Sequence, residues 1–281
     1  MSGSVLVFGA SGTLGVPVVK GLLEKGERVK AATRGGKAIL DAEPVAFEYG
    51  APVDFDALFA GVDRAFLLVP SGYPDAFSLV APVVDAAAAQ KVKLVFLSVL
   101  GADADESIPY RRIERKIEAS GSRYVILRPN WFDDNFHTFW KAGIVHGQIQ
   151  LPAGDGKTSF IDARDIAASA VAALTTNKFD GRAFNLTGPE ALSYAEAAKI
   201  LSKATGKEIG YTAMSDEAFI AMLTSAGVPE EYGKFLATIF APVRAGYMAG
   251  VTGDVTELTG KPALSLEAYA KDHANELQVG S

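Results

Sequence analysis

The sequence predicts an α/β fold built on a doubly wound parallel sheet, followed by a small and mostly helical C-terminal lobe. Short apolar runs of strand type alternate with segments of helical spacing as far as Leu127, which is typical of a parallel sheet with helices on both faces. From Asp216 onwards the pattern is mostly helical, with breaks at Gly227–Pro229, Pro242 and Gly260–Pro262. We therefore expect a sheet domain followed by a lobe.

A glycine-rich turn opens the chain. Val5–Phe8 is an apolar run typical of a buried strand, and apolar residues resume at helical spacing from Val16. Strand, glycine turn and helix in this order are typical of the Rossmann-type dinucleotide-binding unit, in which a pyrophosphate meets free N–H groups at the start of a helix. A plain structural turn is the alternative. The candidate cofactor-binding residues of the turn are Gly9, Ala10, Ser11, Gly12, Thr13, Leu14 and Gly15.

Further strands and helices follow in alternation. Strands are expected at residues 28–33, 44–48, 64–69, 93–98, 124–127 and 182–187, and helices at 55–59, 76–90 and 109–120. Ser193 and Glu196 form the pattern of a capping box before a further helix that ends near Gly206. We expect residues 1–155 to form the dinucleotide-binding domain, and residues 156–281 to complete the sheet and form the lobe, the whole being one compact unit.

Two loops are expected to face the adenosine part of the cofactor. Arg34 follows the second strand, where an arginine accommodates the 2′-phosphate of NADP and an acidic residue would bind the 2′-hydroxyl of NAD. Lys37 is close by, and a solvated surface pair is the alternative for these two residues. The loop after the fourth strand, with Val69, Pro70 and Ser71, is expected to brace the adenine and its ribose.

An aromatic segment follows the strand at 124–127. Its aromatic side chains and one amide are the candidate substrate-binding residues: Trp131, Phe132, Asn135, Phe136, Phe139 and Trp140. Four of the aromatic residues lie at helical spacing, and such stripes are usually core. This segment, however, leaves the carboxyl end of a strand, where open α/β sheets bind ligands. Pocket wall and core therefore both stay open.

Composition excludes several classes of protein. The net charge of −6 and the lack of a long basic run give no reason to expect a nucleic-acid partner. The chain has no cysteine, and its three histidines lie far apart in the sequence, so we expect no metal site. The first strand begins at once, and no apolar run has membrane-spanning length, so we expect a cytoplasmic protein that has no membrane partner and is a monomer or a homodimer.

The chain resembles the NmrA-like members of the atypical short-chain dehydrogenase/reductase superfamily over nearly its whole length. The motifs that carry the resemblance are Gly9–Gly15, Arg34, Arg128–Asn135, Ala153–Lys157, Asp162–Ala167 and Leu186–Pro189. The relatives that it suggests are bacterial NAD(P)H-dependent quinone reductases, azoreductases and triphenylmethane-dye reductases. The resemblance implies NADP(H) on the glycine turn and Arg34, with Pro129, Asn130 and the aromatic segment beside the nicotinamide.

The chain departs from the superfamily at the catalytic dyad. Many members carry Tyr-x-x-x-Lys, but here Glu114 stands at the lysine spacing after Tyr110. Lys116 lies six residues after Tyr110, about 120° away from it around a helix, and cannot substitute. Ser98 sits where the superfamily's serine sits, among the candidate cofactor-binding residues. Tyr110 stays the candidate catalytic residue, with ordinary helix packing as the alternative.

The missing dyad favours acceptors that need no tuned acid. Reduction of a ketone leaves an alkoxide, which is about as basic as hydroxide, whose conjugate acid, water, has a pKa of about 15.7. Reduction of a quinone leaves a phenolate, whose conjugate acid has a pKa of about 10. The resulting hypothesis is an NADPH-dependent oxidoreductase that transfers hydride to a small aromatic or quinonoid acceptor, such as a quinone or an azo compound. A non-enzymatic NADP(H)-binding regulator, which the family also contains, is the alternative.

Overall fold

The computed structural model describes residues 3–70 and 75–278, whose contacts group into two units. Unit 1 comprises residues 1–129, 163–186 and 254–261, and unit 2 comprises residues 130–162, 187–253 and 262–281. From the sequence we expect a single boundary after residue 155. The structure groups the residues on either side of that point differently, because the chain returns twice from unit 2 to the sheet of unit 1.

Unit 1 is built on a seven-stranded sheet in the order β3-β2-β1-β4-β5-β6-β9, and every pair of neighbouring strands is parallel. The strands are β1 (Ser4–Phe8), β2 (Val29–Thr33), β3 (Glu43–Ala46), β4 (Val62–Leu68), β5 (Lys93–Leu97), β6 (Tyr124–Pro129) and β9 (Arg182–Leu186). The predicted doubly wound parallel sheet is confirmed, with β1 inside it. The strand order reverses between β1 and β4, which is where such sheets bind dinucleotides.

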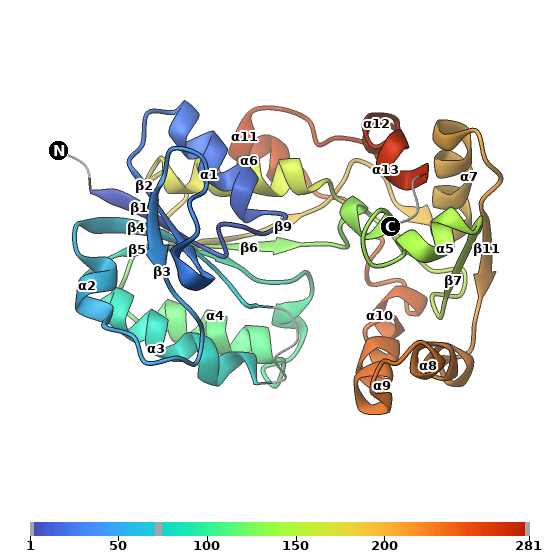
Figure 1. Cartoon of the computed structure of the whole chain (residues 1–281), viewed down its shortest axis with the longest axis horizontal. Helices are drawn as coiled ribbons and strands as arrows, with labels where there is room; N and C mark the ends of the chain where they lie inside the picture. Colours follow the sequence, from blue (N-terminus) through green and yellow to red (C-terminus); the bar gives the residue numbers. More distant parts are fainter. Residues whose placement is uncertain (1–2, 71–74, 279–281) are drawn as a thin grey trace. The chain divides into compact units, whose positions relative to one another are not determined.

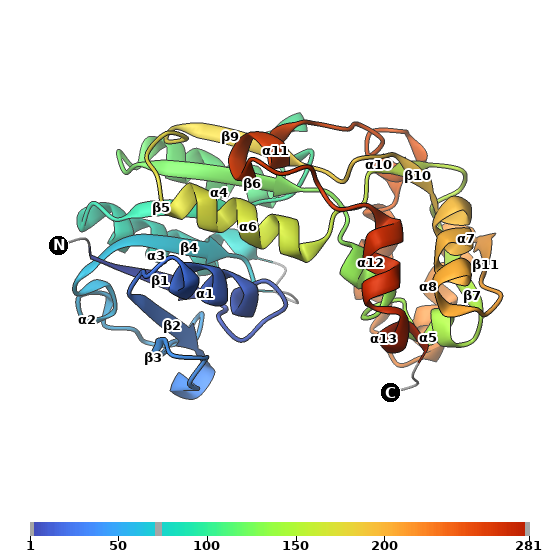
Figure 2. The same cartoon turned by 90° about the horizontal axis from the view of Figure 1, so that it is seen from above.

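Helices cover both faces of this sheet (Figures 1 and 2). On one face lie α1 (Gly15–Glu24), α6 (Ala163–Leu174) and α11 (Asp254–Thr259), and on the other α2 (Phe55–Phe59), α3 (Ala76–Ala89) and α4 (Pro109–Ala119). Short 3₁₀ turns η1 (Arg34–Gly36) and η2 (Ala102–Ala104) follow β2 and β5. Because both faces are covered, the inner strand β1 is a continuous apolar run from Val5 to Phe8, and every residue of β1 is buried.

Unit 2 is mostly helical and contains two small two-stranded sheets. Its helical elements are η3 (Asp133–Phe136), α5 (Lys141–Val145), α7 (Tyr194–Thr205), α8 (Asp216–Ser225), α9 (Glu230–Thr238), α10 (Ala241–Arg244), α12 (Leu266–Asp272) and α13 (Ala274–Gln278). Strand β7 (Gln148–Leu151) pairs with β11 (Gly210–Ala213) in parallel, and β8 (Lys157–Thr158) pairs with β10 (Leu192–Ser193) in antiparallel fashion.

The local signals in the sequence are largely confirmed. The Ser193 and Glu196 side chains form the predicted capping box of α7, whose C-cap Gly206 is left-handed. The helix predicted at residues 55–59 has those bounds, and the other strands and helices predicted by residue range agree within a few residues. The aromatic segment differs: it forms the single 3₁₀ turn η3 rather than a longer helix.

Candidate active site

The glycine turn connects β1 to α1 at the carboxyl edge of the sheet. Gly9 has a φ of +64°, which favours glycine. A Cβ on Gly15 would lie 2.0 Å from the Gly9 carbonyl oxygen and 2.6 Å from the Ala10 Cα, so only glycine lets α1 begin this close to the strand. The turn therefore has the tight packing that the Rossmann-type pattern predicts.

Several N–H groups of this turn are free to bind an anion. The Gly12 N–H donates to the Gly9 carbonyl at 2.9 Å. The N–H groups of Ser11, Thr13 and Leu14 have no acceptor within the part of the chain that the structure describes. They lie at the N-terminus of the ten-residue helix α1, whose dipole favours negative charge there. This donor set fits a pyrophosphate.

Arg34 and Lys37 lie in the turn after β2, and both side chains are exposed. The Thr33 hydroxyl donates to the Lys37 carbonyl at 3.1 Å and closes this turn. Among residues 3–70 and 75–278, neither cationic side chain has a hydrogen-bond or ion-pair partner. Because β2 is parallel to β1, this unpaired charge lies at the same edge of the sheet as the glycine turn. Its chemistry fits a 2′-phosphate.

Val69 and Pro70 follow β4 at this edge and are half-buried. The Leu68 side chain lies beneath the glycine turn, 3.1 Å from where a Cβ on Gly9 would be. The Leu68 carbonyl accepts a hydrogen bond of 2.7 Å from the Tyr49 hydroxyl, so the end of β4 is fixed next to the turn. Ser71, the third candidate in this loop, lies outside the described residues.

Glu114 stands at the centre of a buried polar network. Its carboxylate is fully buried and accepts hydrogen bonds from the Ser98 hydroxyl at 2.6 Å and from Arg111 at 2.7 Å. Arg128 donates to both Glu114 oxygens, at 2.9 and 2.7 Å. Arg128 also pairs with Asp103, and Arg111 with Glu118 at 3.0 Å. In the sequence, Glu114 is recognisable only as a departure from the dyad, and nothing there predicts this network.

The network keeps Glu114 ionised. Burial opposes its ionisation, but the hydrogen bonds from Arg128, Ser98 and Arg111 outweigh burial and hold the pKa of the carboxyl below its usual range. Ser98 is 2% exposed, and its hydroxyl proton is committed to Glu114. The prediction that Ser98 contacts the cofactor is therefore not supported for its side chain, because the side chain faces this network.

Tyr110 lies in the first turn of α4 and packs against the core of unit 1. Its ring lies 6.4 Å from the Phe96 ring, and burial raises the pKa of its hydroxyl. A raised pKa makes a tyrosine a weaker acid. This environment matches helix packing, the alternative left open for Tyr110.

Pro129 ends β6, and Asn130 is the first residue of unit 2. The Asn130 side chain is buried, and its amide donates to the Ser159 hydroxyl at 2.7 Å and to the Met248 carbonyl at 2.9 Å. Its oxygen accepts from the Trp131 N–H at 2.9 Å. Both amide hydrogens of Asn130 are thus used inside unit 2, and its place beside the nicotinamide stays a prediction.

The aromatic segment divides into core and surface. Phe136 is fully buried, with its ring 5.0 Å from Trp140 and 5.3 Å from Phe160. It belongs to the core of unit 2, which fits the core alternative left open for this segment, and its contact with an acceptor stays a prediction. Trp131 stacks on Trp140 at 5.7 Å and on Phe240 at 4.9 Å.

The remaining members of the aromatic segment keep some accessible surface. Phe139 is 79% exposed, whereas Phe132, Asn135, Trp131 and Trp140 are partly exposed. Unlike the fully buried Phe136, these side chains stay candidates for contact with an acceptor.

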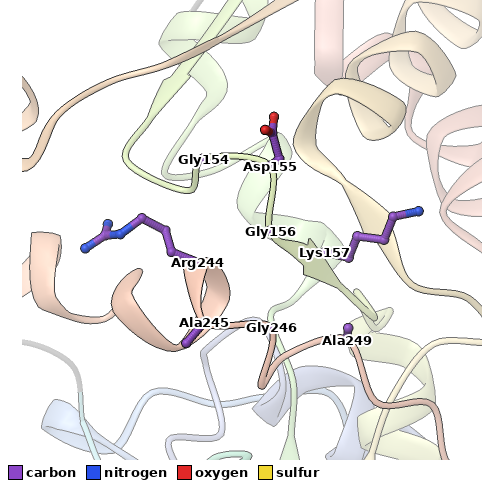
Figure 3. Close-up of a pocket in the computed structure, with 8 residues that line it drawn as sticks. All are labelled: Gly154, Asp155, Gly156, Lys157, Arg244, Ala245, Gly246 and Ala249. Carbon is purple, nitrogen blue, oxygen red and sulfur yellow. The ribbon is translucent and has the colours of Figure 1, made fainter.

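An open hollow of about 550 Å³ lies within unit 2 (Figure 3). Its charged side chains diverge in the figure, and its two cations are engaged elsewhere: Arg244 pairs with Asp216 at 3.0 Å, and Lys157 with Glu196 at 3.1 Å. This engagement leaves the hollow without a free cation to attract an anionic ligand. Its lining residues are Gly154, Asp155, Gly156, Lys157, Arg244, Ala245, Gly246 and Ala249.

Unit 2 also holds a histidine cluster that the sequence did not reveal. His137 and His273 stack with ring centroids 5.1 Å apart and planes within 7°. Tyr269 is hydrogen-bonded to His137 and stacks on His273 at 4.5 Å. Burial is the main cause that lowers the pKa of His137, and the neighbouring His273 lowers it further.

The described residues contain neither a candidate metal cluster nor a candidate membrane span. No group of three or more His, Cys, Asp or Glu side chains in them could hold a metal ion. None of the helices in this part of the chain combines the length and the apolar character needed to cross a bilayer.

The known proteins that this chain resembles include nicotinamide-dependent reductases, in agreement with the dinucleotide-binding geometry of unit 1. The model of the NmrA-like family matches residues 1–277. An NAD(P)H azoreductase of Xenophilus azovorans is 33% identical over 280 residues, which cover 96% of this chain and 98% of that protein.

Solved structures are similar over the same length. The triphenylmethane reductase of a Citrobacter species, in complex with NADP(H), is 25% identical, has a TM-score of 0.84 and is covered to 100%, with 96% of this chain aligned. The NADPH-dependent quinone oxidoreductase of Escherichia coli, in complex with NADPH, is 26% identical with a TM-score of 0.84, covering 95% of this chain and 99% of that one.

Proposed function

We propose that this chain, which belongs to the NmrA-like family, is an NADPH-dependent reductase that transfers hydride to a conjugated acceptor such as a quinone or an azo compound. Oxidoreductase activity with a nicotinamide cofactor is supported by the azoreductase and the quinone reductase among its relatives. The acceptor class is argued from the residues of unit 1.

The cofactor fits the carboxyl edge of the sheet. The free N–H groups of Ser11, Thr13 and Leu14 would bind the pyrophosphate, and Arg34 would bind the 2′-phosphate. NADPH, when bound, supplies the hydride. The chain's own contribution is to hold the cofactor and to bring the acceptor into a productive orientation, which supplies much of the rate of such reactions.

The single observation that carries the acceptor class is the hydrogen bond from the Ser98 hydroxyl to Glu114. It engages the superfamily's serine and puts an ionised carboxylate where the lysine of the dyad would be. Tyr110 has neither that lysine nor a lowered pKa. A ketone would leave a strongly basic alkoxide that needs a positioned acid, whereas the phenolate left by a quinone can take its proton from water.

Absorbance of NADPH, followed with a matched panel of acceptors, tests the proposal. The panel contains a benzoquinone, a naphthoquinone, an azo dye and, as the control, a saturated cyclic ketone of similar size. We expect oxidation of NADPH with at least one conjugated acceptor and none with the ketone. Turnover of the ketone would refute the argument from Ser98 and Glu114. Tight binding of both NADP⁺ and NADPH without turnover of any acceptor would support a regulator instead.

A further inference from the structure

The carboxylate of Glu114 joins three elements of unit 1 at one edge of the sheet. Ser98 is the first residue after β5, Arg128 is the last but one residue of β6, and Glu114 itself comes from the middle of α4. The N–H groups of Ser98 and Leu100 donate to the carbonyls of Leu127 and Pro129 at 2.8 and 2.9 Å. Glu114 thus binds the side chains of Ser98 and Arg128 at the point where β5 and β6 stop pairing.

This position coincides with the second half of a dinucleotide site. In a sheet of this order, the glycine turn and Arg34 serve the adenosine half, on the side of β1, β2 and β3. The nicotinamide half would then lie over the carboxyl ends of β4, β5 and β6. The ends of β5 and β6 are the ends that the Glu114 network ties together.

The network is too costly to be an incidental surface pairing. Glu114 is fully buried, and Arg111 and Arg128 are 7% and 6% exposed. Removing ions from water is favourable only where the partners have good geometry, and here the carboxylate accepts four hydrogen bonds of 2.6–2.9 Å from three side chains. A buried ionic network of this kind selects one arrangement of the elements that it joins.

We propose that Glu114 is a positioning residue for hydride transfer, which holds the ends of β5 and β6 in the arrangement that the nicotinamide half of the cofactor requires, without contacting the acceptor or moving a proton. This inference rests on the proposed function. The network occupies the place of the missing dyad, but its role differs. The dyad supplies a proton, whereas this network fixes the backbone beneath the nicotinamide ring.

The variant Glu114→Gln tests the inference, because it keeps the size of the side chain and removes its charge. The matched control is Glu118→Gln on the same helix, since Glu118 also pairs with Arg111 but does not reach Ser98 or Arg128. Hydrogen exchange of the protein without cofactor gives a readout that does not depend on activity. The reporters are the Ser98 and Leu100 amides, and the Leu94 amide, bonded to Arg123 at the other end of the strand pair, is the internal control.

We expect Glu114→Gln to speed exchange of Ser98 and Leu100 about tenfold or more while that of Leu94 is unchanged. We expect kcat to fall about 10- to 100-fold, the effect of a small misplacement of the reacting groups, with little change in the Kd of NADPH. The pH profile of kcat keeps its shape, because Glu114 holds no transferable proton. Glu118→Gln behaves as the wild type in all these measurements.

Three results would overturn the inference: unchanged exchange of Ser98 and Leu100, a kcat within twofold of the wild type, or a pH limb of kcat that disappears with the charge. Should Glu114→Gln fail to fold, Ser98→Ala replaces it, because that change removes one hydrogen bond and leaves the ion pairs in place. Ser98→Ala is also expected to speed exchange of the Leu100 amide. If the wild type reduces no acceptor, the proposed function fails, and the exchange measurement still decides whether Glu114 holds the strand ends.

Discussion

Replacement of Phe136 by alanine is expected to cost stability rather than acceptor binding. The ring is fully buried and packs edge-on against Trp140 at 5.0 Å. Truncation of a buried phenylalanine costs about 3–5 kcal/mol. Each kcal/mol lowers the melting temperature by about 2–4 °C in chains of roughly 150–250 residues, so Phe136→Ala should melt roughly 6–20 °C lower.

Phe139→Ala is the matched control, because it removes the same ring three residues later from a position that is 79% exposed. Surface changes stay within about 0.5 kcal/mol, so its melting temperature should hardly move. If Phe139 contacts a flat acceptor, its loss raises the KM of aromatic acceptors and leaves the Kd of NADPH unchanged. The two variants are compared by calorimetry and by steady-state kinetics at a temperature where both are folded.

The reasoning fails if Phe136→Ala melts within about 2 °C of the wild type, because a fully buried ring cannot be lost so cheaply. It fails equally if Phe136→Ala raises the KM of aromatic acceptors while the melting temperature is kept. That result would show that the ring leaves the core when an acceptor binds.

Three further predictions concern the cofactor, the proton and pH. Arg34→Ala should weaken the binding of NADPH about 10- to 150-fold, which is the contribution of a charge-assisted hydrogen bond worth about 1.5–3 kcal/mol, and should barely change the binding of NADH in parallel titrations. Equal losses of affinity for both cofactors would show that Arg34 does not bind the 2′-phosphate. Lys25→Ala is the control. Tyr110→Phe should keep kcat within about tenfold, and a thousandfold loss with the fold intact would restore Tyr110 as the proton donor. The folded pKa of His137 is lowered, so the unfolded chain binds its proton first, and the stability it contributes is lost as pH falls below about 6.5. Melting temperatures from pH 7.5 to 5.5 should therefore fall less steeply in His137→Gln than in the wild type, and a variant of the exposed His146 should keep the wild-type slope.

The fold could be predicted because its signals are local. A strand buried on both faces must be apolar throughout, and Val5–Phe8 is such a run. The glycine turn follows from backbone geometry alone, since a Cβ at Gly15 would meet the Gly9 carbonyl. Short pieces such as β7 and β11 were missed, because four residues that pair across about 60 positions leave no periodic signal.

The aromatic segment shows where a pattern stops being informative. Helical spacing predicts which side chains share a face of a helix, but the segment makes only the 3₁₀ turn η3. Phe136 is buried while Phe139 is exposed, and this difference depends on Trp140 and Phe160, which no spacing identifies. Aromatic residues at the end of a strand therefore predict that a packed cluster exists, and leave open which ring faces outward.

The features of the site that depend on one residue could be predicted from the sequence. Those that depend on contacts between several residues could not. A glutamate at the lysine spacing is visible in the sequence, and it shows that the usual proton donor is lost. The network found in place of the dyad depends on the register of β5 and β6. This register brings Ser98 and Arg128 to the Glu114 carboxylate from positions 16 and 14 residues away. Because a buried carboxylate needs cationic partners, Glu114 alone predicts that an arginine must approach it, and the chain offers Arg111, Arg112, Arg115 and Arg128 nearby. Arg111, one turn back on the same helix, could have been chosen from the sequence, but Arg128 could be chosen only once the sheet was known. The chemistry that the site lost is thus legible in the sequence, whereas the positioning role we assign to Glu114 depends on the tertiary structure.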